Sequence, residues 1–168
     1  NVAVARLADE AGLEFLLPIA RWRGYGGLTD RQGSTYETLS WASAMLASTR
    51  GIDVFATVHV PLVNPVFAAK ASATAHHVGQ GRYGLNVVSG WNLDEFGMFG
   101  AKLLEHDERY AYTTEWLEIV RRIWAGETFD FTGRHFNVTN VSGKPQPLNG
   151  QTPLIMSAGS SNAGRAFA

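Results

Sequence analysis

Apolar runs of strand length alternate with helical patterns along most of the chain. The runs that predict strands cover residues 13–19, 52–60, 83–88 and 153–157. Apolar side chains at helical spacing predict helices near residues 1–11, 39–46, 67–75 and 107–124. Alternation of this kind is typical of a parallel sheet whose strands are joined by crossover helices.

Capping residues place the starts of two of these helices. Ser34 with Glu37 has the spacing of a capping box, and Asn64 followed by Pro65 is a typical helix start. Residues 129–138 alternate around a Thr-Gly pair, which predicts a small hairpin outside the main sheet.

The predicted fold class is α/β, and the architecture is part of a (β/α)8 TIM barrel. The pattern gives about four parallel strands, whereas a closed barrel has eight and about 250 residues. We therefore expect residues 1–168 to form one partial barrel domain that lacks the first strand and the C-terminal half.

Composition narrows the function classes. The chain is 45% hydrophobic and 17% charged, with a formal net charge of -1, which gives no support for binding nucleic acid or an anionic membrane. No apolar run has the length of a membrane span. There is no cysteine, which excludes disulfides, thiolate metal sites and a cysteine nucleophile, and is compatible with a cytoplasmic protein.

The run at residues 83–88 carries an amide in an otherwise apolar strand. Burying an unpaired amide costs about 1–3 kcal/mol, so Asn86 is expected to have a hydrogen-bond partner. Ser89, Gly90 and Trp91 follow directly, and Glu95 comes a turn later. Small residues, an aromatic wall and a carboxylate just past a strand are typical of the mouth of an α/β sheet or barrel.

Polar residues near the ends of neighbouring strands point to the same mouth. Thr57 and His59 lie near the end of the second run, and Arg21 and Arg23 follow the first. His59 fits a core histidine and a site residue equally well. The arginines are surface charges in the simpler interpretation, although their place at the loop end of a barrel strand favours function.

An anion site is predicted where small residues link the last strand to a new helix. The turn at residues 157–164 offers backbone N–H groups and the hydroxyls of Ser160 and Ser161, although an ordinary capping serine explains it equally well. Arg109 and Tyr110 open the preceding helix and would suit the same anion, unless Arg109 is a solvated surface residue. His106 is most simply explained by helix capping.

Several common motifs are missing. The sequence has no GxGxxG after a strand, no P-loop and no GxSxG, which disfavours a dinucleotide fold and a serine hydrolase. His76 and His77 are adjacent on a helix and face different directions, so no metal site is expected.

The segments RYGLNVVSGWNLDEF, LEHDERY, KPQP and AGSSNAG together resemble the bacterial-luciferase-like family of flavin-dependent monooxygenases, especially its pyrimidine and dimethylsulfone branch. The likeness extends along essentially the whole chain. It implies a (β/α)8 barrel that uses reduced FMN and O2 to transfer one oxygen atom to a small organic substrate.

The resemblance also implies particular residues. The implied FMN contacts are Ala20, Arg21, Asn86, Glu95, Arg109, Tyr110 and Ser161. Arg109, Tyr110 and Ser161 would hold the phosphate, in agreement with the anion site above. Thr57 and Asn86 would be the catalytic residues that face the flavin ring where oxygen reacts, and the flavin would be the partner of the Asn86 amide. Trp22, Tyr25 and Trp91 would wall the pocket, although plain packing at the barrel mouth explains each of them at least as well.

The implied activity needs a second protein, because a separate NAD(P)H-dependent reductase supplies FMNH2. The glycine-rich segment ARWRGYGG follows the pyrimidine branch, whereas NVVSGW follows the sulfone branch, so a sulfone or sulfonate and a pyrimidine-like substrate both stay open. Dimers are common among such proteins, which makes a homo-oligomer the expected state. The alternatives are a deazaflavin-dependent hydride-transfer enzyme of the same superfamily and a non-catalytic flavin- or phosphate-binding piece.

Overall fold

The computed structural model describes all 168 residues. Its elements follow the order α1 (Val2–Glu10), β1 (Phe15–Leu16), α2 (Thr38–Ser48), β2 (Asp53–His59), η1 (Val60–Leu62), α3 (Pro65–Val78), β3 (Tyr83–Val88), α4 (Leu93–Met98), α5 (His106–Trp124), β4 (Phe129–Thr132), β5 (Asn137–Val141), η2 (Leu148–Gly150), β6 (Leu154–Ser157) and α6 (Asn162–Phe167). None of the helices combines the length and the apolar character needed to cross a membrane.

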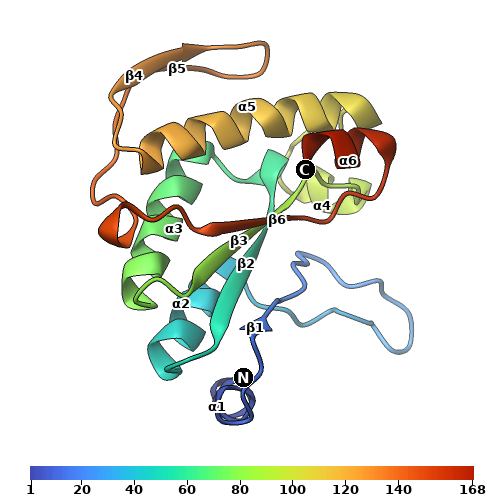
Figure 1. Cartoon of the computed structure of the whole chain (residues 1–168). Helices are drawn as coiled ribbons and strands as arrows, with labels where there is room; N and C mark the ends of the chain where they lie inside the picture. The colour runs from blue at the N-terminus through green and yellow to red at the C-terminus, as the bar shows by residue number, and fades with distance from the viewer.

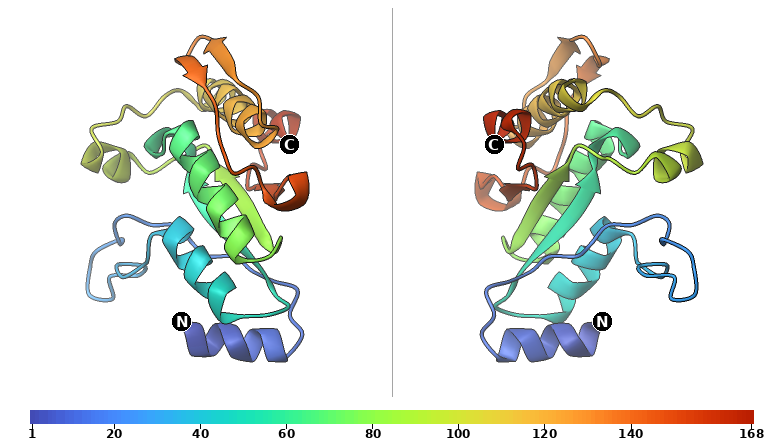
Figure 2. Two further views of the ribbon diagram at one scale, coloured as in Figure 1. Left: turned by 90° about the vertical axis from the view of Figure 1, so that its left-hand side faces the viewer. Right: turned by 90° about the vertical axis from the view of Figure 1, so that its right-hand side faces the viewer.

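Four parallel strands form the main sheet, in the order β1-β2-β3-β6. Helices connect each strand to the next, and Figures 1 and 2 show α2 and α3 lying against one face of the sheet. The predicted parallel α/β fold is therefore confirmed. Strands β4 and β5 form a separate antiparallel hairpin, also as predicted.

The hydrophobic core lies between the sheet and its helices. Alternate residues of β2 and β3 enter it, among them Val54, Ala56, Val58, Leu85 and Val87, and α5 adds Trp116, Ile119 and Val120. The residues between them point to the opposite face of the sheet. On that face Gly84 lies against Phe55, and a Cβ on Gly84 would overlap the Phe55 ring.

The first strand differs from the prediction of a buried strand at residues 13–19. Only Phe15 and Leu16 pair with β2, and Phe15 and Ile19 are 46% and 58% exposed. This strand lies at the edge of the sheet, where it pairs with β2 alone. Pro18, which lacks a backbone N–H, comes where the chain leaves the sheet.

Two helix starts also differ from expectation. Glu37 is itself the N-cap of α2, and its carboxylate accepts from the backbone N–H groups of Leu39 and Ser40, so the predicted capping box with Ser34 is wrong. The short helix α4 was not predicted. Asn92 caps it by accepting from the backbone N–H of Asp94.

Candidate functional site

Parallel strands bring the polar residues of their carboxyl ends to one edge of the sheet. Thr57 and Asn86 are paired in register on β2 and β3, and Asn86 is in turn paired with Met156 of β6. The loops that follow β1 and β3 project from this same end (Figure 2). This edge is where a barrel carries its functional groups.

A chain of hydrogen bonds joins three segments at this edge. The Asn86 amide donates to the Thr57 hydroxyl over 3.1 Å, and that hydroxyl donates to the carbonyl oxygen of Pro18 over 2.7 Å. Both side chains are buried. The expectation that Asn86 has a hydrogen-bond partner is confirmed, and the partner is a protein group.

The carboxylate of Glu95 is the most enclosed charge in this region, with 1% of its side chain exposed. It accepts from Arg21 Nη1 over 3.2 Å and from the backbone N–H groups of Trp22 and Arg23 over 2.9 and 3.4 Å. Glu95 therefore fastens the loop after β1 to helix α4. We call this group, made of Arg21, Trp22, Arg23 and Glu95, the lip.

Aromatic rings complete the lip. The Arg21 guanidinium lies 4.6 Å from the centre of the Trp91 ring and 5.9 Å from that of Tyr25, within range of cation–π attraction. The Trp22 ring packs edge-on against Phe99 at 4.8 Å. The three aromatic residues predicted to wall a pocket therefore lie together around Arg21 and α4.

His59 lies beneath the lip and is 5% exposed. Its Nδ1 atom has no hydrogen-bond partner and is 3.8 Å from a Glu95 oxygen. Burial lowers the pKa of the imidazole, Glu95 opposes that shift, and Arg21 adds to it. Ala20 is also buried here and lines a small cavity with Thr57 and His59.

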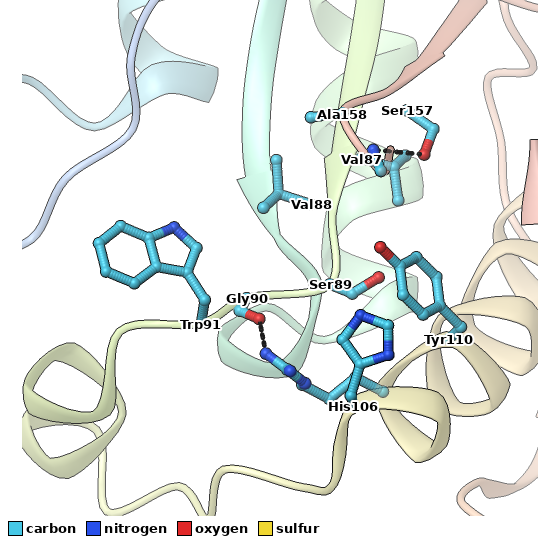
Figure 3. A pocket seen from close by; sticks show the side chains of 11 residues that line it. Val87, Val88, Ser89, Gly90, Trp91, His106, Tyr110, Ser157 and Ala158 are labelled. Carbon is cyan, nitrogen blue, oxygen red and sulfur yellow. Dashed lines mark hydrogen bonds between the residues drawn. The ribbon is translucent and has the colours of Figure 1, made fainter. Parts of the chain in front are cut away.

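A larger pocket of about 280 Å³ opens beside the end of β3. Figure 3 shows it between the segment that follows β3, the start of α5 and the end of β6. Its lining comprises Val87, Val88, Ser89, Gly90, Trp91, His106, Arg109, Tyr110, Ser157, Ala158 and Gly159. We call it the α5 pocket.

One side of helix α5 faces this pocket. His106, Arg109, Tyr110 and Thr113 follow the three- and four-residue spacing that places side chains on one helix face. The Thr113 hydroxyl lies 3.0 Å from that of Ser89. Arg109 donates through Nη1 to the Gly90 carbonyl oxygen, while its Nε atom is buried without any partner.

Two glycines bring the turn after β6 against Tyr110. A Cβ on Gly159 or Gly164 would lie 2.7 or 2.8 Å from the Tyr110 hydroxyl oxygen, so side chains there would push the turn away. Ser161 caps α6 by accepting from the Gly164 N–H over 3.1 Å. It is thus next to the α5 pocket without lining it.

The sequence-predicted residues fall into three neighbouring groups at one end of the sheet. Arg109 and Tyr110 line the α5 pocket, with Ser161 in the adjoining turn. Thr57 and Asn86 form the buried hydrogen-bond chain, and Arg21 and Glu95 form the lip beside Ala20.

Sequence reasoning missed the place of His106. It was assigned to helix capping, but Glu105 is the N-cap residue and makes no side-chain capping bond. His106 instead lines the α5 pocket. Its spacing from Arg109 and Tyr110 was the available signal, since residues three and four apart share a helix face.

Comparison with known proteins identifies relatives over the whole chain. It is 37% identical over 169 residues to the FMNH(2)-dependent dimethylsulfone monooxygenase of Pseudomonas fluorescens, covering 100% of this chain and 44% of that protein. It is 33% identical over 172 residues to the pyrimidine monooxygenase RutA of Acinetobacter baylyi, covering 99% and 45%. The chain spans about half the length of the curated relatives it matches.

Solved structures match the fold. A crystal structure of riboflavin lyase with modified FMN and riboflavin has a TM-score of 0.89 at 24% identity, over 99% of this chain and 44% of that one. DmoA from Hyphomicrobium sulfonivorans has a TM-score of 0.86 at 22% identity, over 100% and 42%. The four-stranded sheet is thus part of a luciferase-like (β/α) barrel. The profile of the luciferase-like monooxygenases matches residues 1–168, so the chain belongs to that family.

Proposed function

We propose that this chain provides the FMN-binding part of an FMNH2-dependent monooxygenase that oxygenates a small organic compound, of the sulfone or sulfonate or the pyrimidine type. A separate NAD(P)H-dependent flavin reductase would supply the reduced flavin. The named activities of the dimethylsulfone and pyrimidine monooxygenases that this chain resembles support the proposal.

The observation that supports this proposal most directly is that one N–H donor of Arg109 has no hydrogen-bond acceptor in the protein. A buried guanidinium N–H without an acceptor is unfavourable, and charged donors are among the costliest groups to leave unpaired. The Arg109 Nε is such a donor, and the residue lines a pocket that also contains the Tyr110 hydroxyl and the Gly159 turn. The Arg109 guanidinium would be a donor to a phosphate oxygen bound in this pocket.

The residues present therefore fit FMN. Arg109 and Tyr110 would hold its phosphate, with Ser161 and the turn after β6 beside them. Ala20, Arg21, Asn86 and Glu95 would surround the rest of the cofactor. Reduced FMN, when bound, would supply the two electrons with which one oxygen atom of O2 is transferred to the substrate and the other leaves as water.

The protein's own contribution is positioning and exclusion of water. The Asn86 and Thr57 side chains are fixed by their hydrogen bonds, so they present polar groups at a set place on the sheet edge. Glu95 holds the loop after β1 against helix α4, above His59. The Arg21, Trp22 and Trp91 side chains shield that region. Such an enclosed site protects reactive species from water.

Binding of FMN and riboflavin to Arg109→Ala tests the phosphate assignment. We expect FMN affinity to fall about 10- to 100-fold, the loss of one charge-assisted hydrogen bond, while riboflavin affinity is unchanged. Arg121→Ala is the matched control, because that arginine is exposed on the same helix and lies outside the α5 pocket. Equal losses for both ligands would contradict the phosphate contact.

A second experiment tests the reaction class. The protein is supplied with a flavin reductase, NADH, FMN and O2, with dimethylsulfone or uracil as substrate, and oxygenated products are measured. Titration with FMN and with a deazaflavin cofactor is run in parallel. Binding of the deazaflavin but not of FMN would contradict the FMN assignment. Binding of FMN without any oxygenated product would mean that the chain binds flavin but does not catalyse oxygenation.

A further inference from the structure

His106 is a second side chain on the pocket face of α5 that carries hydrogen-bonding nitrogen atoms, beside Arg109. It precedes Arg109 by three residues and Tyr110 by four, and its ring centre is 5.3 Å from that of Tyr110. Figure 3 shows the imidazole next to Tyr110 in the α5 pocket.

The partner of His106 determines where its protons lie. Nδ1 is 2.7 Å from an Asp107 carboxylate oxygen. Because a carboxylate only accepts, Nδ1 carries the hydrogen of this bond. A neutral ring then has a lone pair on Nε2, which repels a phosphate oxygen, whereas a ring protonated at Nε2 as well donates a hydrogen bond to it.

No other pocket group offers the same change of charge. A guanidinium, such as that of Arg109, is not deprotonated in proteins, and Tyr110 contributes a hydroxyl. The segments that line the pocket from β3, residues 87–91, and from β6, residues 157–159, contain no ionisable side chain. Asp107 is the remaining charged group in contact with the ring.

We propose that His106 is a further phosphate contact and that it takes up one proton at Nε2 from solvent when FMN binds. This inference rests on the proposed function. A bound phosphate would lie among Arg109, Tyr110 and the imidazole, and its charge near −2 favours the imidazolium form. The site would then prefer a terminal phosphate, as in FMN, over riboflavin.

Calorimetry of FMN binding at pH 7.5 in PIPES and in Tris tests this, because the two buffers differ in their heat of ionisation. At this pH the phosphate is already almost fully dianionic, since its second pKa is about 6. We expect the binding enthalpy to differ between the buffers in the direction of proton uptake. His106→Asn keeps a donor but cannot be protonated, so the uptake should disappear and FMN affinity should fall about 2- to 5-fold, the scale of an exposed ion pair.

Two controls fix the interpretation. His77→Asn removes an exposed histidine on α3 and should leave proton uptake unchanged. Riboflavin, which lacks the phosphate, should bind wild type and His106→Asn equally and without uptake. Unchanged uptake in His106→Asn, or no uptake by wild type that binds FMN, would overturn the proposal for His106. Failure of wild type to bind FMN would overturn the proposed function, and this inference with it.

Discussion

Two arginines at the same end of the sheet are used in opposite ways. Arg21 in the lip is 9% exposed, pairs with Glu95 and lies against aromatic rings. Arg109 in the α5 pocket makes one hydrogen bond, to a carbonyl oxygen, and keeps a buried N–H without a partner. Protein groups accept hydrogen bonds from the Arg21 guanidinium, whereas one N–H of Arg109 has no acceptor in the protein.

The difference separates structural from ligand-binding charge. A buried ion pair stabilises the fold only while both partners are present. A buried donor without an acceptor lowers stability, and a protein keeps it where a ligand completes the bond. We therefore expect substitutions in the lip to act on folding as well as on binding, and those in the α5 pocket to act mainly on binding.

The largest effect is expected for Glu95→Ala. It leaves the Arg21 charge without its carboxylate and removes the acceptor of two backbone N–H groups, so the free energy of unfolding should fall by about 3–5 kcal/mol. Denaturant unfolding measures it. A loss below about 1 kcal/mol would mean that the lip does not hold this end of the molecule together.

Thr57→Val should have the next largest effect. It removes the hydroxyl that joins Asn86 to Pro18 and leaves a buried amide N–H and a carbonyl oxygen unpaired, at a cost of about 1–3 kcal/mol. Thr114→Val, at an exposed position of α5, is the matched control in the same unfolding assay. Equal stabilities of the two variants would show that the buried chain contributes nothing.

Arg109→Ala should change stability little, by less than about 1 kcal/mol, since it removes one hydrogen bond and one unpaired donor together. Unfolding without ligand measures this, and added FMN should stabilise wild type far more than the variant. A loss as large as that of Glu95→Ala would remove the contrast between the two arginines.

The smallest effect concerns pH. Burial holds the pKa of His59 below its usual value of 6.5, so the unfolded chain binds this proton more readily than the folded protein. The free energy of unfolding should therefore fall as pH drops below 6.5. His59→Gln should reduce this dependence without abolishing it, because burial also lowers the pKa of His76. An unchanged pH profile between 7 and 5 would contradict the shift.

Periodic patterns predicted the buried parts of the fold well. The run at residues 83–88 coincides with β3, because a strand buried on both faces appears as a continuous apolar run. The long helix ends at Trp124 as expected, because a helix buried along one stripe has apolar residues at helical spacing. The prediction for residues 13–19 was less accurate, since an apolar run in the sequence does not reveal whether another strand or helix covers it in the fold. The six residues of α4 are too few to show a period.

The site was less predictable because its contacts are non-local. Arg21 and Glu95 are 74 positions apart, and nothing in either segment indicates that the carboxylate also accepts from backbone N–H groups. Asn86 required a partner, but the choice between Thr57 and a ligand depended on strand register. Family resemblance supplied the candidate residues, and the structure supplied their partners.

The placement of several polar side chains near the α5 pocket on a single helix has an evolutionary consequence. His106, Arg109, Tyr110 and Thr113 face one way because α5 is regular, and farther along the same face Trp116 and Trp124 anchor the helix in the core. One inserted or deleted residue among them would rotate part of this set by about 100°. Length variation among homologous chains should therefore be absent from residues 106–116 and accumulate in the loop at 99–105.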